Sequence, residues 1–586
     1  MLWSAAFPPV GIAGFAWIAP GLIIAGVLGK QGAETFRIGY VAGLAHYLSM
    51  LYWLLLIPYR WHGLPLAPAL GWIALSAFLS LYTGTWVWMV ARMRGLEIKV
   101  QKPEAKEHGS TVNESNNQEP GASLQSTRAG LVCNDDERLT GILPRSWSGR
   151  TLWTLSCAAA WVALEMFIAR VFGGFPWDLL GVSQYRMVPL IQMASVTGVY
   201  GISFLVVWLS LSLLSAGLMM IRRPTTRSIW LGEICLPILV VAILFNLGFH
   251  RLNHVEPRGR TIRVTLVQPS IPQTLIWDAS KSADRFRELL QLSEQALTNQ
   301  TDLMIWPESA VPKLLRYDQE TFEATTALAR RHHIWLIVGS DDAEPRRAAK
   351  NPDDADYFNS SFLISPEGKL VERYVKRNLV IFGEYLPLQS WLPFLKYFTP
   401  IEGGFTPGTH AARFELTDLR VQTPMLICFE DTFPHLARKD VRPETSFLVN
   451  ITNDGWFDES AAQWQQALTA VFRTVENGVP LVRCANNGLT CWIDVQGRLR
   501  DVFHDGRGSV YGSGYLLAEI PIPAPGQSHE LTFYTRHGDW FGWGCVAIGA
   551  ISLICKMIRA WLGYSHSSAG YSPASTSGLP SGVKEG

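Results

Sequence analysis

The distribution of apolar residues divides the chain into two parts. Up to residue 250 it contains several apolar runs of about 20 residues, the length that crosses the hydrocarbon core of a bilayer as a helix. Residues 260–525 instead alternate short apolar runs with charged segments, which is typical of a soluble enzyme. The pattern therefore predicts a polytopic α-helical membrane bundle that carries a soluble α/β domain.

Seven apolar runs are predicted to span the membrane, and the basic residues beside them give the orientation. The runs are residues 11–29, 37–58, 68–91, 152–172, 200–221, 229–249 and 540–561. If each run crosses once, the loops richest in Lys and Arg all fall on one side, which the positive-inside rule assigns to the cytoplasm. These loops contain Lys30 and Arg37; Arg92, Arg94 and Lys99; Arg222, Arg223 and Arg227; and Lys556 and Arg559. Residues 250–539 then lie outside the cytoplasm.

Two segments lack the large apolar side chains that a folded core needs. They are residues 101–130, within a cytoplasmic linker of residues 96–150, and the Ser- and Gly-rich tail of residues 562–586. The predicted domains are the helix bundle (1–250), a catalytic domain (251–535) and a C-terminal membrane helix (540–561). Because the first basic residue is Lys30, no cleavable secretory signal is predicted, and the N-terminal topology stays open.

The soluble part alternates strand-like and helix-like segments. Strands are predicted at residues 261–268, 303–306, 334–339, 358–365, 421–428, 446–452, 480–486 and 489–494, and helices at 281–299, 319–332 and 460–477. Such alternation favours an α/β domain, in which ligands gather at the carboxyl ends of strands. Glu308 follows the strand "LMIW", and Cys428 ends the strand "VQTPMLIC". Both residues therefore stand where a site is expected.

The composition and the cysteine pattern limit the functions that the chain can have. The 586 residues have a net charge of +1 and are 48% hydrophobic, which gives no basic footprint for nucleic acid. Of the eight cysteines, Cys428, Cys484 and Cys491 fall in the exported domain, and neither CxxC nor HExxH occurs, so no metal site is predicted. A single cysteine at the end of an apolar strand is more often a buried small hydrophobe than a nucleophile. Whether Cys428 is a nucleophile therefore depends on the residues around it.

A nucleophilic cysteine needs a base to take its proton and a cation to stabilise the thiolate and the oxyanion. "IWPESAVP" supplies Glu308, and "RYVKRNLVIFGEYLP" supplies Lys376 and Glu384. Each residue alone is a weak signal, because an acid at a strand end is usually a solvated cap and a lysine beside an arginine is usually surface charge. The order Glu, Lys, Cys along the chain is specific.

Several motifs carry a resemblance to known families. "WPES", "YVKRNLVIFGEYLP", "LICFED", "NITNDGWF" and "CANNGLT" resemble the nitrilase (carbon-nitrogen hydrolase) superfamily, which has a Glu-Lys-Cys triad. "GGFPWDLLGVSQY", "VQPSIPQTLIWD" and "TFYTRHGDWFGW" further resemble the apolipoprotein N-acyltransferase family of the bacterial inner membrane. The likeness covers nearly the whole chain outside the linker and the tail.

The resemblance implies a role for each residue of the site. Glu308 would be the general base, Lys376 the stabiliser of the oxyanion and Cys428 the nucleophile, with Glu384 and Glu430 as supporting acids.

It also implies three residues that bind substrate: Trp277 in "PQTLIWD", Phe429 and Trp456. Phe429 departs from the tyrosine that the family would place after the cysteine, so a hydrogen bond from that hydroxyl is missing, whereas packing or lipid contact survives the change.

The implied fold is a four-layer α-β-β-α sandwich on a helix bundle, with the catalytic domain on the periplasmic side of the inner membrane. The implied reaction is ping-pong: the cysteine takes an acyl chain from a phospholipid such as phosphatidylethanolamine. The thioester then acylates the α-amine of the S-diacylglyceryl cysteine of an apolipoprotein. The resemblance implies no cofactor and no nucleic-acid partner, and we expect a monomer.

Three other functions remain open at this point. A membrane-tethered amide or nitrile hydrolase would share the triad but let water attack the acyl-enzyme, and the "FPW" and "PQTLIWD" motifs argue against it. A binding or scaffold protein would have a dismantled triad, whereas all three residues are present. A transporter is disfavoured because the spans contain few charges and no evident repeat.

Aromatic and acidic residues of the bundle are predicted to be structural or interfacial. "FPW" (175–177) and "YWLLLIPYRW" (52–61) would form an interfacial belt or merely anchor the bundle. Glu165, inside the span 152–172, is costly in lipid and should face the bundle interior with a structural partner. Cys484 and Cys491 are expected in the core.

Overall fold

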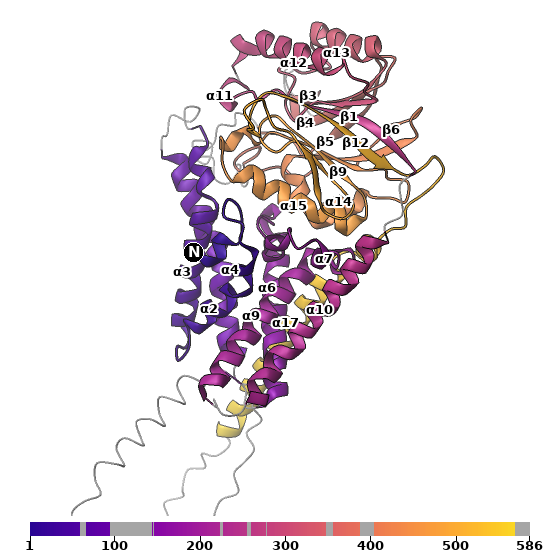
Figure 1. Cartoon of the computed structure of the whole chain (residues 1–586). Coiled ribbons are helices and arrows are strands. Elements are labelled where there is room, and N and C mark those ends of the chain that lie inside the picture. Colours follow the sequence, from indigo (N-terminus) through magenta and orange to yellow (C-terminus); the bar gives the residue numbers. More distant parts are fainter. Residues whose placement is uncertain are drawn as a thin grey trace, which may run out of the picture.

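A helix bundle stands under an α/β domain in the computed structural model (Figure 1), which describes residues 1–58, 66–93, 143, 146–222, 227–254, 259–276, 278–346, 355–386 and 404–568. Within these ranges four helices are long and apolar enough to cross a membrane. They are α4 (Ala67–Arg92), α6 (Trp147–Ile168), α9 (Val199–Arg222) and α10 (Arg227–Asn253). Two further helices pack along them, α3 (Ala33–Met50) against α4 and α17 (Trp540–Ser568) against α6.

The first predicted span is wrong. Residues 11–29 form a 3-10 helix, η1 (Ala13–Trp17), and a short α-helix, α2 (Ala19–Ala25), rather than one long helix. Pro20 stands at the start of α2, and proline cannot donate the backbone hydrogen bond that would continue a helix through it. The second predicted span also ends early, because α3 stops at Met50 and a 3-10 helix, η2 (Tyr52–Leu56), follows.

Two other predicted boundaries shift. Ser146 caps the start of α6 by accepting a hydrogen bond from the Gly149 amide, so the helix begins inside the predicted linker of residues 96–150. Residues 101–130 of that linker lie outside the described residues. At the other end, α17 continues to Ser568, beyond the predicted start of the tail at residue 562.

Two six-stranded sheets form the middle of the α/β domain. The first has the order β12-β1-β2-β3-β4-β5 and the second β11-β10-β9-β8-β7-β6. The strands of the first are β1 (Arg260–Gln268), β2 (Leu303–Ile305), β3 (Trp335–Pro345), β4 (Ala355–Ile364), β5 (Leu370–Val375) and β12 (Gly514–Ile522). Those of the second are β6 (Arg413–Leu416), β7 (Val421–Ile427), β8 (Leu448–Thr452), β9 (Leu481–Ala485), β10 (Cys491–Ile493) and β11 (Leu499–Val502). In each sheet three neighbouring strands are parallel, β1-β2-β3 and β7-β8-β9.

The two sheets pack face to face, and helices cover both outer faces. Ile305 and Ile337 of the first sheet share one buried cluster with Ile427 and Ile451 of the second. Helices α12 (Ser282–Ala296) and α13 (Gln319–His332) cover the first sheet, and α14 (Pro434–Asp440) and α15 (Ala462–Asn477) lie between the second sheet and the bundle (Figure 1). The predicted four-layer α-β-β-α sandwich on a helix bundle is confirmed.

Helix α15 joins the catalytic domain to the bundle. All of its residues except Trp464 are buried. The indole N–H groups of Trp53, in η2, and Trp177 both donate to the side-chain oxygen of Gln465 on α15, at 3.0 and 2.9 Å. The carboxylate of Glu476 near its end accepts from the Val199 amide at the start of α9, at 2.9 Å. These polar contacts fix the membrane part against the domain that carries the site.

Candidate active site

The three predicted triad residues all follow strands. Glu308 comes three residues after β2, and Lys376 and Cys428 come directly after β5 and β7. Glu308 and Lys376 are buried, and Cys428 is partly buried. Because β2 and β5 belong to one sheet and β7 to the other, the site lies where the ends of the two sheets meet.

Lys376 is held by two carboxylates. Its ammonium donates to Oε1 of Glu308 at 3.2 Å and to Oε1 of Glu384 at 2.8 Å. Although burial opposes the charge, these two carboxylates raise the pKa of Lys376 well above its ordinary value, so it stays an ammonium. The side-chain amide of Asn359, on β4, donates to the same oxygens of Glu308 and Glu384, at 2.7 and 2.8 Å. The predicted supporting acid Glu384 therefore lies beside the triad.

Glu308 is also fixed from the second sheet. Its Oε2 accepts the backbone amide of Asn453, which follows β8, at 2.8 Å. The side chain of Asn453 in turn donates to Gln273 at 2.8 Å and accepts from Asn486 at 2.9 Å. The position of the Glu308 carboxylate is thus set by groups from both sheets.

Cys428 begins a 3-10 turn, η9 (Cys428–Thr432), with a φ of +53° that non-glycine residues rarely adopt. The Asn450 side chain donates to the Cys428 carbonyl at 2.9 Å and holds this turn. Burial and the Glu308 carboxylate raise the pKa of the Cys428 thiol above its ordinary value, against the opposing effect of Lys376. The resting thiol is therefore protonated at neutral pH and needs a base before it can attack.

Glu430 ties the cysteine turn to the lysine strand. The carboxylate is fully buried and accepts the Ile427 amide at 2.8 Å and the Tyr374 hydroxyl at 2.7 Å. It also accepts the backbone amides of Arg377 and Asn378, directly after Lys376, at 2.7 and 3.0 Å. Glu430 thus holds the Cys428 turn against the strand end that carries Lys376, and its supporting role in catalysis stays a prediction.

A second buried network lies behind the cysteine turn and was not found from the sequence. Arg483 on β9 pairs with Asp431 at 2.7 Å and with Asp454 at 2.6 Å, and all three side chains are buried. Asp431 also accepts from Gln466 on α15 at 3.1 Å. The network braces the turn after Cys428 against β9 and α15. The sequence feature that could have indicated this network is Arg483, a charged residue inside the apolar strand "PLVRCAN".

Two polar residues on neighbouring strands of the first sheet were also missed. Asn359 lies on β4 opposite Asp341 on β3. Asp341 accepts a long hydrogen bond from the Ser309 hydroxyl at 3.5 Å, next to Glu308. Burial, followed by the charges of Glu308 and Glu384, raises the pKa of Asp341 to about 7. Both are polar residues within predicted or neighbouring strand segments close to Glu308. This position in the sequence could have indicated that they belong to the site.

The three residues predicted to bind substrate have different outcomes. Trp277 lies outside the described residues. Phe429 is half-buried, and its ring lies 5.7 Å from Phe175 and 6.1 Å from Trp177. Trp456 is half-buried in a 3-10 turn, η10 (Asp454–Phe457). Phe429 therefore contacts the "FPW" segment of the bundle, and a substrate role for all three remains a prediction.

The aromatic segments of the bundle face the catalytic domain. The Trp53 ring lies 5.2 Å from Trp177 and 4.3 Å from Phe457, beside Trp456. Residues 59–61 of "YWLLLIPYRW" lie outside the described residues. Together with Phe175 and Phe429, these rings form an apolar wall where the bundle meets the α/β domain.

Expectations for Glu165 and for two cysteines also hold. Glu165 is buried in the bundle, and its Oε1 accepts from the Trp161 indole and from the Leu180 amide, both at 2.9 Å. Cys484 and Cys491 are buried free thiols in the core.

Family models match both parts of the chain. A carbon-nitrogen hydrolase model matches residues 263–519, and a model of the apolipoprotein N-acyltransferase N-terminal domain matches residues 1–104 and 138–212.

Individual proteins match as well. An apolipoprotein N-acyltransferase of Geobacter metallireducens is 34% identical over 94% of this chain and 92% of its own length. One of Bradyrhizobium diazoefficiens is 32% identical over 67% of this chain and 72% of its own length. Among solved structures, an amidase from Nesterenkonia sp. is 17% identical, with a TM-score of 0.32, over 45% of this chain and 92% of that chain.

Proposed function

This chain belongs to the apolipoprotein N-acyltransferase family, and we propose that it moves an acyl chain from a phospholipid, through a thioester on Cys428, to the α-amine of a diacylated apolipoprotein. The observation that carries the proposal is the pair of ion contacts that hold the Lys376 ammonium between Glu308 and Glu384. A buried base, a buried cation and a protonated thiol at the meeting edge of two sheets are the parts that acyl transfer through a cysteine requires.

The first half-reaction begins at Cys428. Its sulfur attacks the ester carbonyl of the phospholipid while Glu308 takes the thiol proton. As the C–S bond forms, the carbonyl oxygen becomes an oxyanion that the Lys376 ammonium stabilises. When this tetrahedral intermediate collapses, the ester C–O bond breaks and Glu308 returns the proton to the departing lysophospholipid hydroxyl. The product is a thioester on Cys428.

The second half-reaction uses the same groups. The α-amine of the acceptor attacks the thioester carbonyl, and Glu308 takes a proton from the nitrogen. Lys376 again stabilises the oxyanion, the C–S bond breaks, and the proton passes to the Cys428 sulfur. Glu384 keeps the Lys376 ammonium in place throughout, because its other oxygen is anchored by the Val380 amide at 2.8 Å.

The bundle supports a lipid substrate. The rings of Phe175 and Trp177 pack on Phe429, which directly follows Cys428, and this apolar wall can shield a thioester from water. We place the enzyme in the bacterial inner membrane as a monomer, with the catalytic domain in the periplasm. The basic loops support this orientation, and an ethanolamine phospholipid is the proposed donor.

Intact mass spectrometry of the detergent-purified enzyme tests the proposal. After incubation with phosphatidylethanolamine, we expect one acyl adduct on the wild type and none on Cys428→Ala. A diacylated lipopeptide added next should discharge the adduct and gain a third acyl chain. If no adduct forms, or if water removes it at the same rate without lipopeptide, acyl transfer is refuted and a hydrolase takes its place.

A further inference from the structure

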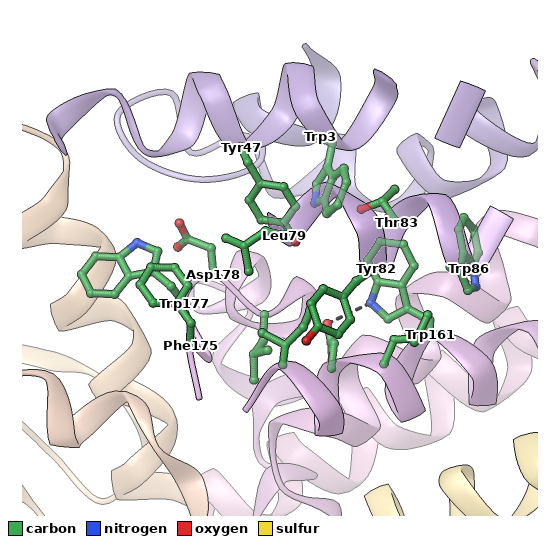
Figure 2. A pocket seen from close by; sticks show the side chains of 14 residues that line it. Trp3, Tyr47, Leu79, Tyr82, Thr83, Trp86, Trp161, Phe175, Trp177 and Asp178 are labelled. Carbon is green, nitrogen blue, oxygen red and sulfur yellow. Dashed lines mark hydrogen bonds between the residues drawn. The ribbon is translucent and has the colours of Figure 1, made fainter. Parts of the chain in front are cut away.

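A small cavity lies inside the membrane bundle, next to the active site. It has a volume of about 30 Å³ and is bounded by α3, α4, α6 and the segment before the 3-10 helix η6 (Leu180–Gln184). Figure 2 shows that aromatic rings surround it, among them Trp3, Tyr47, Tyr82 and Trp161. An apolar cavity of this kind would require no further explanation.

Two acids, however, reach this cavity without a basic partner. Asp178 is 7% exposed, and neither of its carboxylate oxygens has a hydrogen-bond partner within the described residues. Glu165 is 5% exposed, and its Oε1 accepts hydrogen bonds from the Trp161 indole and the Leu180 amide. Among the described residues, those that line the cavity include no Lys, Arg or His. Burying an acid without a basic partner is costly, and a cationic group in the cavity would offset that cost.

The size and walls of the cavity define the cation. A volume of about 30 Å³ has room for a water-sized group, and a primary ammonium is a group of that size. Aromatic faces attract such cations through their negative π surfaces. The lining therefore favours a primary ammonium held by carboxylates within an aromatic cage.

The cavity shares a wall with the active site. Phe175 and Trp177 line it, and the same two rings lie within 5.7 and 6.1 Å of Phe429, the neighbour of Cys428. A molecule with its ammonium group in the cavity would therefore extend along this wall toward the nucleophile.

We propose that this cavity binds the primary ammonium group of an amphiphilic substrate, with Asp178 as the main contact and Glu165 as the second. The inference rests on the proposed function and names a binding site for it. Two substrates carry such a group, the headgroup of an ethanolamine phospholipid and the free α-amine of a diacylated lipopeptide.

The test measures binding without reaction. The Cys428→Ala protein is examined by native mass spectrometry with dioleoyl phosphatidylethanolamine, phosphatidylcholine or phosphatidylglycerol, and with a diacylated lipopeptide whose amine is free or acetylated. The same probes are applied after Asp178→Asn, which keeps the shape and removes the charge. Asp284→Asn, on the surface helix α12, is the matched control. A thermal melt of each variant verifies folding.

We expect Asp178→Asn to weaken the binding of one free-amine probe by about tenfold, since losing a hydrogen bond to a charged group lowers affinity by about that factor. Loss confined to phosphatidylethanolamine identifies the donor headgroup, and loss confined to the free-amine lipopeptide identifies the acceptor amine. Equal binding of the three phospholipids and of the two lipopeptides by the Cys428→Ala protein would overturn the inference, even if Asp178→Asn does not fold. The inference would also be overturned if Asp178→Asn left the preference for free-amine probes over the other probes unchanged. Because no thioester forms here, absence of an acyl adduct on the wild type refutes only the proposed function.

Discussion

The carboxylate of Glu430 accepts the backbone amide of Arg377 at 2.7 Å, and through this bond the turn that carries Cys428 is tied to the strand end that carries Lys376. The two residues lie 53 positions apart in the chain, and they follow strands of different sheets, β7 and β5. The spacing between Cys428 and Lys376 therefore depends on the Glu430 side chain. Glu430 also accepts the Ile427 amide, so one carboxylate holds both sides of the site.

Glu430→Gln should impair catalysis more than stability. A glutamine can accept at only one end, so at least one buried donor among the Ile427, Arg377 and Asn378 amides loses its partner, at a cost of about 1–3 kcal/mol. We expect thioester formation to slow by about tenfold or more, while the far-UV circular dichroism spectrum stays unchanged. Single-turnover acylation followed by mass spectrometry provides the rate. A variant with the wild-type rate would show that Glu430 does not position the triad.

Glu308→Gln should change the pKa of the Cys428 thiol and the rate of Cys428 acylation in different ways. The Glu308 carboxylate raises the pKa of the Cys428 thiol, so Glu308→Gln should lower that pKa and make the thiol alkylate at lower pH. Acylation by phospholipid should nevertheless fall by about 10²–10⁴-fold, because the general base is gone. The pH dependence of iodoacetamide labelling is measured in a Cys235→Ser background, since Cys235 is exposed. Faster labelling together with faster acylation would contradict a base role for Glu308.

The catalytic domain should detach in part from the bundle when Gln465 loses its amide. Gln465→Leu leaves the indole N–H groups of Trp53 and Trp177 without their shared acceptor, at a cost of about 1–3 kcal/mol for each buried donor. We expect a lower melting temperature and a change in tryptophan fluorescence. Gln496→Leu is the control, because the Gln496 side chain bonds only the Leu252 carbonyl, at 3.2 Å, among the described residues. An equal effect of both variants would argue against a specific role for Gln465.

The sequence indicated where the three predicted triad residues lie better than it indicated the hydrogen bonds around them. Glu308, Lys376 and Cys428 stand at strand ends, where side-chain type and position are visible in the chain. By contrast, the bond from the Asn453 amide to Glu308 is made by the backbone, and every residue except proline has that donor. No side-chain pattern could reveal it.

Among the helices and strands, those with a clear apolar periodicity were easier to predict from the sequence than short strands at sheet edges. Helices α12 and α13 follow their apolar periodicity and were predicted, whereas β5, β6, β11 and β12 were not. Strands β6 and β11 have only four residues each and lie at sheet edges, so their exposed faces dilute the apolar pattern. The first membrane span failed because apolar composition alone cannot detect the break that Pro20 introduces.

Asp341 should make the stability of the catalytic domain depend on pH near neutrality. Burial and the charges of Glu308 and Glu384 raise its pKa from 3.8 to about 7. Because the folded state holds the proton more tightly than the unfolded state, this group favours folding at low pH. The benefit is fully present below about pH 4 and is lost as the pH rises through about 7.

Asp341→Asn should remove that dependence. The side chain keeps its shape but cannot ionise, so the variant should melt at a higher temperature than the wild type at pH 8, and the difference should shrink toward pH 5. A stability gain of 1 kcal/mol corresponds to about 2–4 °C in a domain of this size. Differential scanning calorimetry from pH 5 to pH 8 measures the trend, with Asp284→Asn as the exposed control. A difference in melting temperature that does not vary with pH would show that Asp341 does not titrate in this range.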